Sequence, residues 1–253
     1  MLRAGKGPPL VLLHGFCSAA RGWQLLIDSL SDGFEVIAPD WPGFGESIDR
    51  APLASVPDMA AWVVSLVDRM GLERVSLLGH SMSGYVVQAL LRDHEGRVDR
   101  AVLYGAGLAD PVAARFESLD QTIDRLLREG SAATARRVCA TWFVEGEAAA
   151  GYSGCVADGA LMDVAAGVAA LRACEGIDFA GTLCAVGRDA LVILGDRDRT
   201  FRVSDAVALK EALPRARLCV MPGCAHAAHH EAPEQFAEIL RGFLEEPMHT
   251  RLR

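Results

Sequence analysis

The chain has 253 residues and a formal net charge of −8, with 51% hydrophobic and 23% charged residues. This acidic balance argues against nucleic acid or an anionic membrane as a partner, since both require a basic surface. No apolar run approaches the roughly 18–20 residues of a membrane span, and the first residues lack the apolar core of a secretory signal. Seven cysteines without C-x-x-C spacing favour a reducing compartment, and hence the cytoplasm.

Apolar runs and amphipathic stretches alternate along the first 104 residues. We predict strands at Leu10–His14, Glu35–Pro39, Val75–Leu78 and Arg100–Tyr104, and helices at about Trp23–Leu30, Pro57–Met70 and Met82–Asp93. Alternation of this kind predicts a parallel sheet with helices on both faces. Ligands bind such sheets at the carboxyl ends of the strands.

The residues before the first long strand are few. Met1 to Pro8 are too short for a strand hairpin, so Glu35–Pro39 is expected at or near an edge of the sheet. Exposed edges pair readily with another chain. We therefore expect either a homodimer through this edge or a covering segment formed by Met1 to Pro8.

The first long strand ends in His14-Gly15-Phe16. The glycine leaves the backbone N–H of Phe16 free to point above the sheet, where it can stabilise a developing negative charge. This N–H is the first candidate for an oxyanion hole.

The hexapeptide Gly79-His80-Ser81-Met82-Ser83-Gly84 follows an apolar strand and opens an amphipathic helix. A serine on such a strained turn is pushed out of the backbone, within reach of a base and of a substrate. Ser81 has small neighbours two residues away on either side, so it is the candidate nucleophile. The Met82 N–H is the second oxyanion donor. Ser83 replaces the last glycine of the usual G-x-S-x-G pattern.

The strand pattern lapses between Gly107 and Ala190, where apolar residues recur at helical spacing. We interpret residues 110–186 as a helical cap inserted into a core of residues 1–109 and 187–246, with a polar tail at 247–253. The cap residues that we name as candidates to line an acyl pocket are Trp142, Phe143, Tyr152 and Met162. Simple packing of an apolar helical face is the alternative for each of them.

Two further strands precede polar loops. Ala190–Leu194 leads to Asp196 and Asp198, and either carboxylate can serve as a catalytic acid. Arg217–Met221 leads to His226, the candidate base. His229 and His230 follow closely, but no pattern of metal-ligand spacing accompanies them, so we interpret them as loop or surface residues.

The order Ser81, Asp198, His226 resembles that of the α/β-hydrolase superfamily. The motifs that carry the resemblance are H-G-F, D-W-P-G-F-G-E-S from Asp40 to Ser47, and G-x-x-D from Gly195 to Asp198. The similarity extends from Pro9 to about Leu244 and implies a three-layer fold with a mostly parallel, mainly eight-stranded sheet. Because only Met1 to Pro8 precede the first long strand, we expect either that the N-terminal strand pair is absent here or that the coding start lies upstream. Its G-x-x-D spacing favours Asp198 over Asp196.

The resemblance implies a serine hydrolase that forms an acyl-enzyme and needs no metal or organic cofactor. A serine nucleophile excludes the dehalogenases and epoxide hydrolases of this fold, which use a carboxylate. We expect a carboxylesterase or lactonase acting on a small to medium substrate. A thioesterase, a C–C bond hydrolase or a slow-turnover receptor are the alternatives, and the C–C hydrolase is disfavoured because Gly-Pro-Gly does not follow the first strand.

Overall fold

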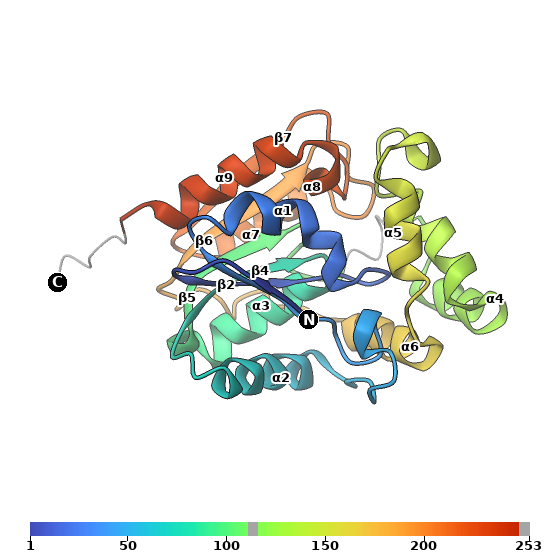
Figure 1. Ribbon diagram of the computed structural model, residues 1–253, viewed down its shortest axis with the longest axis horizontal. Coiled ribbons are helices and arrows are strands. Elements are labelled where there is room, and N and C mark those ends of the chain that lie inside the picture. The colour runs from blue at the N-terminus through green and yellow to red at the C-terminus, as the bar shows by residue number, and fades with distance from the viewer. Residues whose placement is uncertain (111–115, 248–253) are drawn as a thin grey trace.

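The computed structural model describes residues 1–110 and 116–247, and it confirms the predicted parallel sheet (Figure 1). The strand order is β1-β3-β2-β4-β5-β6-β7, and all neighbours are parallel except β1 and β3. The strands are β1 (Leu2–Ala4), β2 (Pro9–Leu13), β3 (Glu35–Ala38), β4 (Val75–His80), β5 (Val98–Tyr104), β6 (Asp189–Gly195) and β7 (Ala216–Met221). The central strands β2 and β4 are buried almost throughout because helices cover both faces.

The edge beside β3 is covered by the start of the chain itself. Leu2, Arg3 and Ala4 pair antiparallel with Ala38, Ile37 and Val36. The Arg3 side chain also forms an ion pair with Glu35. Of the two expectations for this edge, the covering segment is present in the structure, in the form of one short strand.

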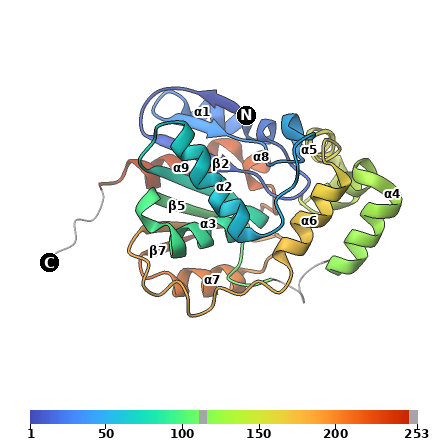
Figure 2. The ribbon, with the colours of Figure 1, turned by 90° about the horizontal axis from the view of Figure 1, so that it is seen from below.

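Helices pack against both faces of the sheet and define two apolar layers (Figures 1 and 2). Helices α1 (Gln24–Leu30), α8 (Ala228–Glu231) and α9 (Pro233–Glu245) supply residues to one layer. Helices α2 (Val56–Arg69), α3 (Met82–Asp93) and α7 (Val203–Ala212) supply residues to the other. The carboxyl ends of the parallel strands therefore meet along one rim of the core.

The described chain between β5 and β6 is helical. It contains α4 (Leu119–Cys139), α5 (Tyr152–Gly159) and α6 (Val164–Cys174), which lie together beside the sheet in Figures 1 and 2. The backbone at Gly130 is not helical and kinks α4. Helices α5 and α6 are separate, and the Asp163 side chain caps the start of α6 by accepting from the Ala166 N–H. The predicted tail at 247–253 lies, after its first residue, outside the described residues.

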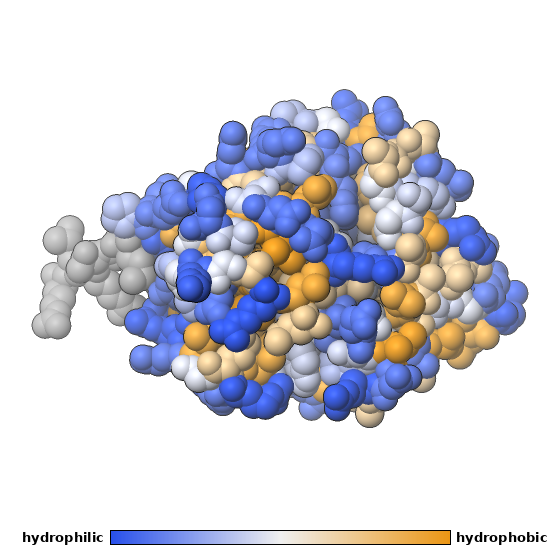
Figure 3. Space-filling view, viewed as in Figure 1, coloured by the Kyte–Doolittle hydropathy of each residue, from blue (hydrophilic) through white to orange (hydrophobic). Residues whose placement is uncertain are grey.

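The surface is mainly hydrophilic, with apolar patches between the polar residues and several of them over α4–α6 (Figure 3). In the chain between β5 and β6, the side chains of Phe116, Leu127 and Val144 are exposed. None of the described helices has the length and apolar character needed to cross a membrane.

Candidate active site

Ser81 lies at the turn between β4 and α3, with φ 55° and ψ −117°. A positive φ is strained for a residue with a side chain and persists only where its surroundings hold it. Here the Ser81 N–H donates to the Tyr104 carbonyl at 2.8 Å, and the Ser81 carbonyl accepts from the Gly84 N–H at 2.8 Å. A Cβ on Gly79 would lie only 2.3 Å from the Ser83 carbonyl oxygen. The turn therefore has the geometry of a nucleophile elbow.

Asp198 and His226 meet above the carboxyl ends of β6 and β7. The His226 Nδ1 donates to the Asp198 Oδ2 at 2.7 Å, and their side chains are only 2% and 1% exposed. The second carboxylate oxygen accepts from the backbone N–H groups of Thr200, at 2.7 Å, and Phe201, at 3.1 Å. These bonds fix the carboxylate, and the carboxylate in turn fixes the imidazole with its Nε2 free.

Asp196 occupies a different environment. It is exposed at the end of β6, and its carboxylate accepts from the Gly223 N–H at 2.7 Å. It therefore ties the loop after β7 to the loop after β6 without contacting His226.

A buried cluster of aromatic and histidine side chains supports the backbone of His226. The His226 carbonyl accepts from the His80 Nε2 at 3.0 Å and from the Tyr104 hydroxyl at 2.8 Å. Because that hydroxyl has only one proton, the His229 Nδ1, 2.9 Å away, must donate to it. Burial holds the pKa of His80 and of His229 well below the ordinary value. Both are therefore neutral hydrogen-bonding groups.

The interpretation of His229 and His230 as loop or surface residues is wrong. They lie in the short helix α8, His229 is buried against Trp23 with ring centroids 4.7 Å apart, and the His230 ring lies 4.3 Å from that of His229. Burial also lowers the pKa of His230. The tight turn after β7 folds them under the rim of the sheet, which their polarity alone does not reveal.

The two predicted oxyanion donors line the same pocket as Ser81. Met82 is the first residue of α3, where the N–H has no partner within the helix. The His14 Nδ1 donates to the Gly15 carbonyl at 2.9 Å, while the His14 Nε2 accepts from the Trp41 N–H at 3.2 Å. A trans peptide points its carbonyl and N–H in opposite directions. Holding the Gly15 carbonyl therefore also holds the Phe16 N–H.

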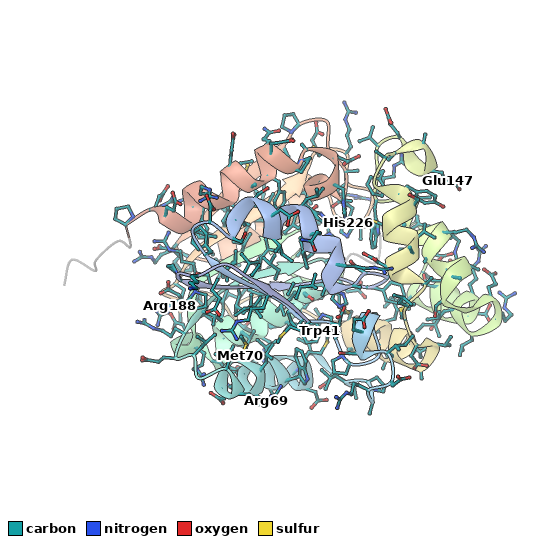
Figure 4. All side chains as sticks on the ribbon, viewed as in Figure 1. Trp41, Arg69, Met70, Glu147, Arg188 and His226 are labelled. Carbon is teal, nitrogen blue, oxygen red and sulfur yellow. The ribbon has the colours of Figure 1, made fainter. Side chains whose placement is uncertain are left out.

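Ser83, which departs from G-x-S-x-G, is fully buried beneath the elbow. Its hydroxyl donates to the His14 carbonyl and accepts from the Trp41 Nε1 at 3.2 Å. The extra hydroxyl thus connects the elbow to the loop that carries the first oxyanion donor. Figure 4 labels Trp41 and His226 on the side of the core that faces α4–α6.

A pocket with an empty volume of about 710 Å³, its open mouth included, joins these groups. Its wall is mostly apolar and combines core residues with residues of the helical segment. The described residues that line it are Phe16, Ser81, Met82, Tyr85, Phe116, Glu117, Thr122, Val138, Thr141, Trp142, Ala170, Leu171, Cys174, Thr200, Phe201 and His226.

Of the four residues predicted for the acyl pocket, Trp142 lines it and three lie elsewhere. Phe143 is fully buried beside Gly151, and the Tyr152 hydroxyl donates to a backbone carbonyl of α4. Met162 is buried and pairs through its backbone with Phe44. Each of these three side chains packs the helical segment against itself or against the core.

Glu117 and Thr122 are pocket residues that the sequence analysis missed. The Glu117 carboxylate accepts from the Thr122 hydroxyl at 3.0 Å and from the Arg137 Nε at 3.2 Å. The neighbouring Arg136 is exposed, and Arg172 pairs with carboxylates on the surface. No sequence signal distinguishes Arg137 from Arg136, because only the rotation of α4 turns one of them inward.

Within residues 1–110 and 116–247, no group of three or more His, Cys, Asp or Glu side chains is arranged to hold a metal ion. All seven cysteines are free thiols. The described residues that line the pocket include Ser81, the histidine His226 that is paired with Asp198, and the residues Phe16 and Met82.

Comparison with known proteins points to one family. The family model for the alpha/beta hydrolase fold matches residues 8–233. The chain is 30% identical over 259 residues to a 2-hydroxymuconate semialdehyde hydrolase of Pseudomonas sp. (strain CF600), covering 96% of this chain and 89% of that protein. It is also 30% identical over 252 residues to a pimeloyl-[acyl-carrier protein] methyl ester esterase of Nitrosomonas europaea, covering 92% and 94%.

A solved structure agrees at the level of the fold. A hydrolase from Pseudomonas aeruginosa PA01 superimposes with a TM-score of 0.88 at 23% identity, covering 97% of this chain and 93% of the other.

Proposed function

Because the chain belongs to the alpha/beta hydrolase fold family, we propose that it is a serine hydrolase of small to medium carboxylic esters or lactones. The observation that carries the proposal is the buried pair of Asp198 and His226, which faces the same pocket as Ser81. A histidine oriented by a carboxylate, in the same pocket as a serine on a strained turn, is the arrangement that activates a hydroxyl for attack on an acyl carbon.

In the proposed reaction, the Ser81 Oγ attacks the carbonyl carbon while the His226 Nε2 takes its proton. Asp198 holds the imidazole tautomer and stabilises the imidazolium. The N–H groups of Phe16 and Met82 stabilise the oxyanion. The imidazolium then gives its proton to the leaving alkoxide, and a water activated by His226 releases the acid and restores Ser81.

We further propose that residues 110–186 act as a cap on the core of residues 1–109 and 187–246. Described residues of both parts line the pocket, among them Trp142 and Leu171 from one and Phe16 and Phe201 from the other. The mostly apolar wall favours a small neutral acyl group. The seven free thiols support a location in the cytoplasm, because disulfides form mainly in oxidising compartments.

A C–C bond hydrolase is the second candidate, and the 30% identity to the 2-hydroxymuconate semialdehyde hydrolase favours it. That substrate carries a carboxylate, which requires a cation or a strong donor to bind it. The ionisable side chains known to line the pocket include the carboxylate of Glu117, which repels such a group. We therefore place the ester or lactone hydrolase first.

A fluorophosphonate probe tests the nucleophile. We expect it to label Ser81, and Ser81→Ala to lose both the label and turnover, by a factor on the order of 10⁶. Ser83→Ala is the matched control, because it removes the neighbouring hydroxyl and should keep the label. Labelling that persists in Ser81→Ala would overturn the assignment.

A substrate panel tests the bond that is cleaved. We expect steady turnover of p-nitrophenyl esters, with an optimum at short acyl length once the pocket is full, because each buried methylene contributes up to about 0.8 kcal/mol. Ring-fission dienoates should turn over far more slowly. The reverse preference would support the C–C hydrolase, and a single acylation without further cycles would support a receptor.

A further inference from the structure

We infer that Glu117 sets the charge selectivity of the pocket by masking Arg137, so that neutral acyl groups are accepted and carboxylate-bearing ones are refused. The inference rests on the proposed ester hydrolysis for its turnover assay. Its binding assay is independent of that function.

Glu117 is a carboxylate built into the pocket wall. Its side chain is 9% exposed and lines the same pocket as Ser81 and His226. The Thr122 hydroxyl donates to the Glu117 Oε1 at 3.0 Å. Because this carboxylate is almost shielded from water, its charge acts on a bound ligand with little screening.

Arg137 lies behind this carboxylate. Its Nε donates to the Glu117 Oε1 at 3.2 Å, and its Nη1 donates to Glu129 at 3.0 Å. Its Nη2 is buried and has no hydrogen-bond partner among the described residues. Arg137 itself does not line the pocket. Glu117 therefore stands between the ligand and a guanidinium that has unused donor capacity.

Among the described residues, the ion pairs around Glu117 join two positive and two negative charges. Arg137 and Arg125 contribute two positive charges, with the Arg125 Nε 3.7 Å from the Glu117 Oε2, while Glu117 and Glu129 contribute two negative charges. Neutralising Glu117 removes the negative charge that lines the pocket and leaves the guanidinium groups of Arg137 and Arg125 without this carboxylate as a partner. Such a site prefers a carboxylate, because guanidinium groups bind carboxylates with strong, charge-assisted hydrogen bonds.

The alternative is that Glu117 only stabilises the chain before α4, where Ser118 caps the helix. Glu129 provides the matched control for this purely structural alternative. It pairs with the same Arg137 and carries the same charge, but it is 38% exposed and lies outside the pocket lining. A purely structural ion pair predicts similar effects for Glu117→Gln and Glu129→Gln.

The turnover test uses two esters of equal acyl length, p-nitrophenyl pentanoate and p-nitrophenyl monoglutarate. For Glu117→Gln we expect the ratio of kcat/KM, monoglutarate over pentanoate, to rise by a factor on the order of ten or more. Glu129→Gln should leave the ratio within about twofold, because an exposed charge is screened. Arg137→Gln should lower this ratio below that of the unaltered chain, since it leaves the exposed Arg125 as the remaining ion-pair partner of Glu117 among the described residues.

The binding test uses the Ser81→Ala variant, with methyl pentanoate and monomethyl glutarate titrated by calorimetry. Adding Glu117→Gln should reverse the preference from the neutral to the anionic ligand. If this reversal occurs while no variant hydrolyses an ester, the inference stands and the proposed function fails. The inference is overturned if esters are hydrolysed but Glu117→Gln changes neither the kcat/KM ratio nor the ligand preference. It is also overturned if Glu129→Gln changes the kcat/KM ratio and the ligand preference as much as Glu117→Gln does.

Discussion

Asp196 and Asp198 are two residues apart in one loop but have different physical roles. Asp196 is exposed and accepts a bond from the backbone of the next loop, whereas Asp198 is enclosed, with both of its oxygens occupied. Only the second arrangement holds an imidazole in one tautomer. The difference arises from how the loop curls after β6, since Thr200 and Phe201 turn their N–H groups back onto Asp198.

We expect Asp198→Asn to lower kcat by about 10⁴, because the amide donates where the carboxylate accepts and so favours the wrong tautomer of His226. Asp196→Asn is the matched control and should cost less than about tenfold. Steady-state kinetics on one activated ester decides between them. Equal losses in both variants would mean that neither aspartate has the assigned role.

At the scale of elements, the loop after β7 must reach back across the sheet. In the strand order, β5 and β6 separate β7 from β4, which at roughly 4.8 Å per strand is about 14 Å. His226 bridges this gap by lying over the end of β5. A Cβ on Gly105, which has φ 55°, would be 3.1 Å from the His226 Cε1.

Gly105→Ala should therefore displace the base as well as strain the backbone. We expect kcat to fall by roughly 10–100-fold, because small misplacements of a catalytic group are costly, with a stability loss of about 1–2 kcal/mol. Gly96→Ala, with open space at its Cβ and no positive φ, is the control. Kinetics and urea unfolding on both variants measure the two effects, and an unchanged kcat in Gly105→Ala would contradict this position of His226.

The sequence predicted the core elements well because each strand there is a continuous apolar run that ends in a polar loop. That pattern places Ser81, His226 and the two aspartates Asp196 and Asp198 on one rim, since strand ends there meet in space. The choice of Asp198 over Asp196 rests on the family resemblance. The helical segment was predicted less well. Phe143 and Met162 belong to apolar stripes that fit either packing or a pocket, and the kink at Gly130 and the rotation of α4 decide which side chains face inward. Arg137 was missed for the same reason.

At the scale of the whole molecule, buried neutral histidines couple stability to pH. Burial lowers the pKa of His14 to about 4 and those of His80 and His229 well below the ordinary 6.5. Below pH 6.5 the unfolded chain therefore binds more protons than the folded one. The stability that these residues contribute is complete above about pH 6.5 and is lost as the pH falls toward the folded-state pKa values.

We expect the free energy of unfolding to decrease by up to about 1.4 kcal/mol per pH unit on account of His14 between pH 6.5 and about 4. His80 and His229 should change it in the same direction. Urea unfolding curves at pH 7.5, 6.5, 5.5 and 4.5 measure this slope. A free energy that stays constant from pH 7 to pH 5 would show that these histidines are not held neutral in the fold.

Strand β7 forms the edge of the sheet opposite β1, and most of its residues are exposed or only half-buried. Edge strands open at lower cost than central ones. Because His226 follows β7 while Ser81 follows the central β4, fraying of this one strand would separate the proposed base from the proposed nucleophile. Esterase activity should therefore disappear at a lower urea concentration than the far-ultraviolet dichroism, and coincident transitions would contradict this.

A ligand that contacts both Ser81 and His226 would join the centre of the sheet to its edge. Such a ligand would bind only to molecules in which β7 is paired with the sheet, so by mass action it would stabilise the paired form over the frayed form. In hydrogen exchange, an occupied pocket should slow the amides of β7 far more than those of β4. Ligand binding in the pocket would thus reversibly stabilise the pairing of the edge strand β7 with the rest of the sheet.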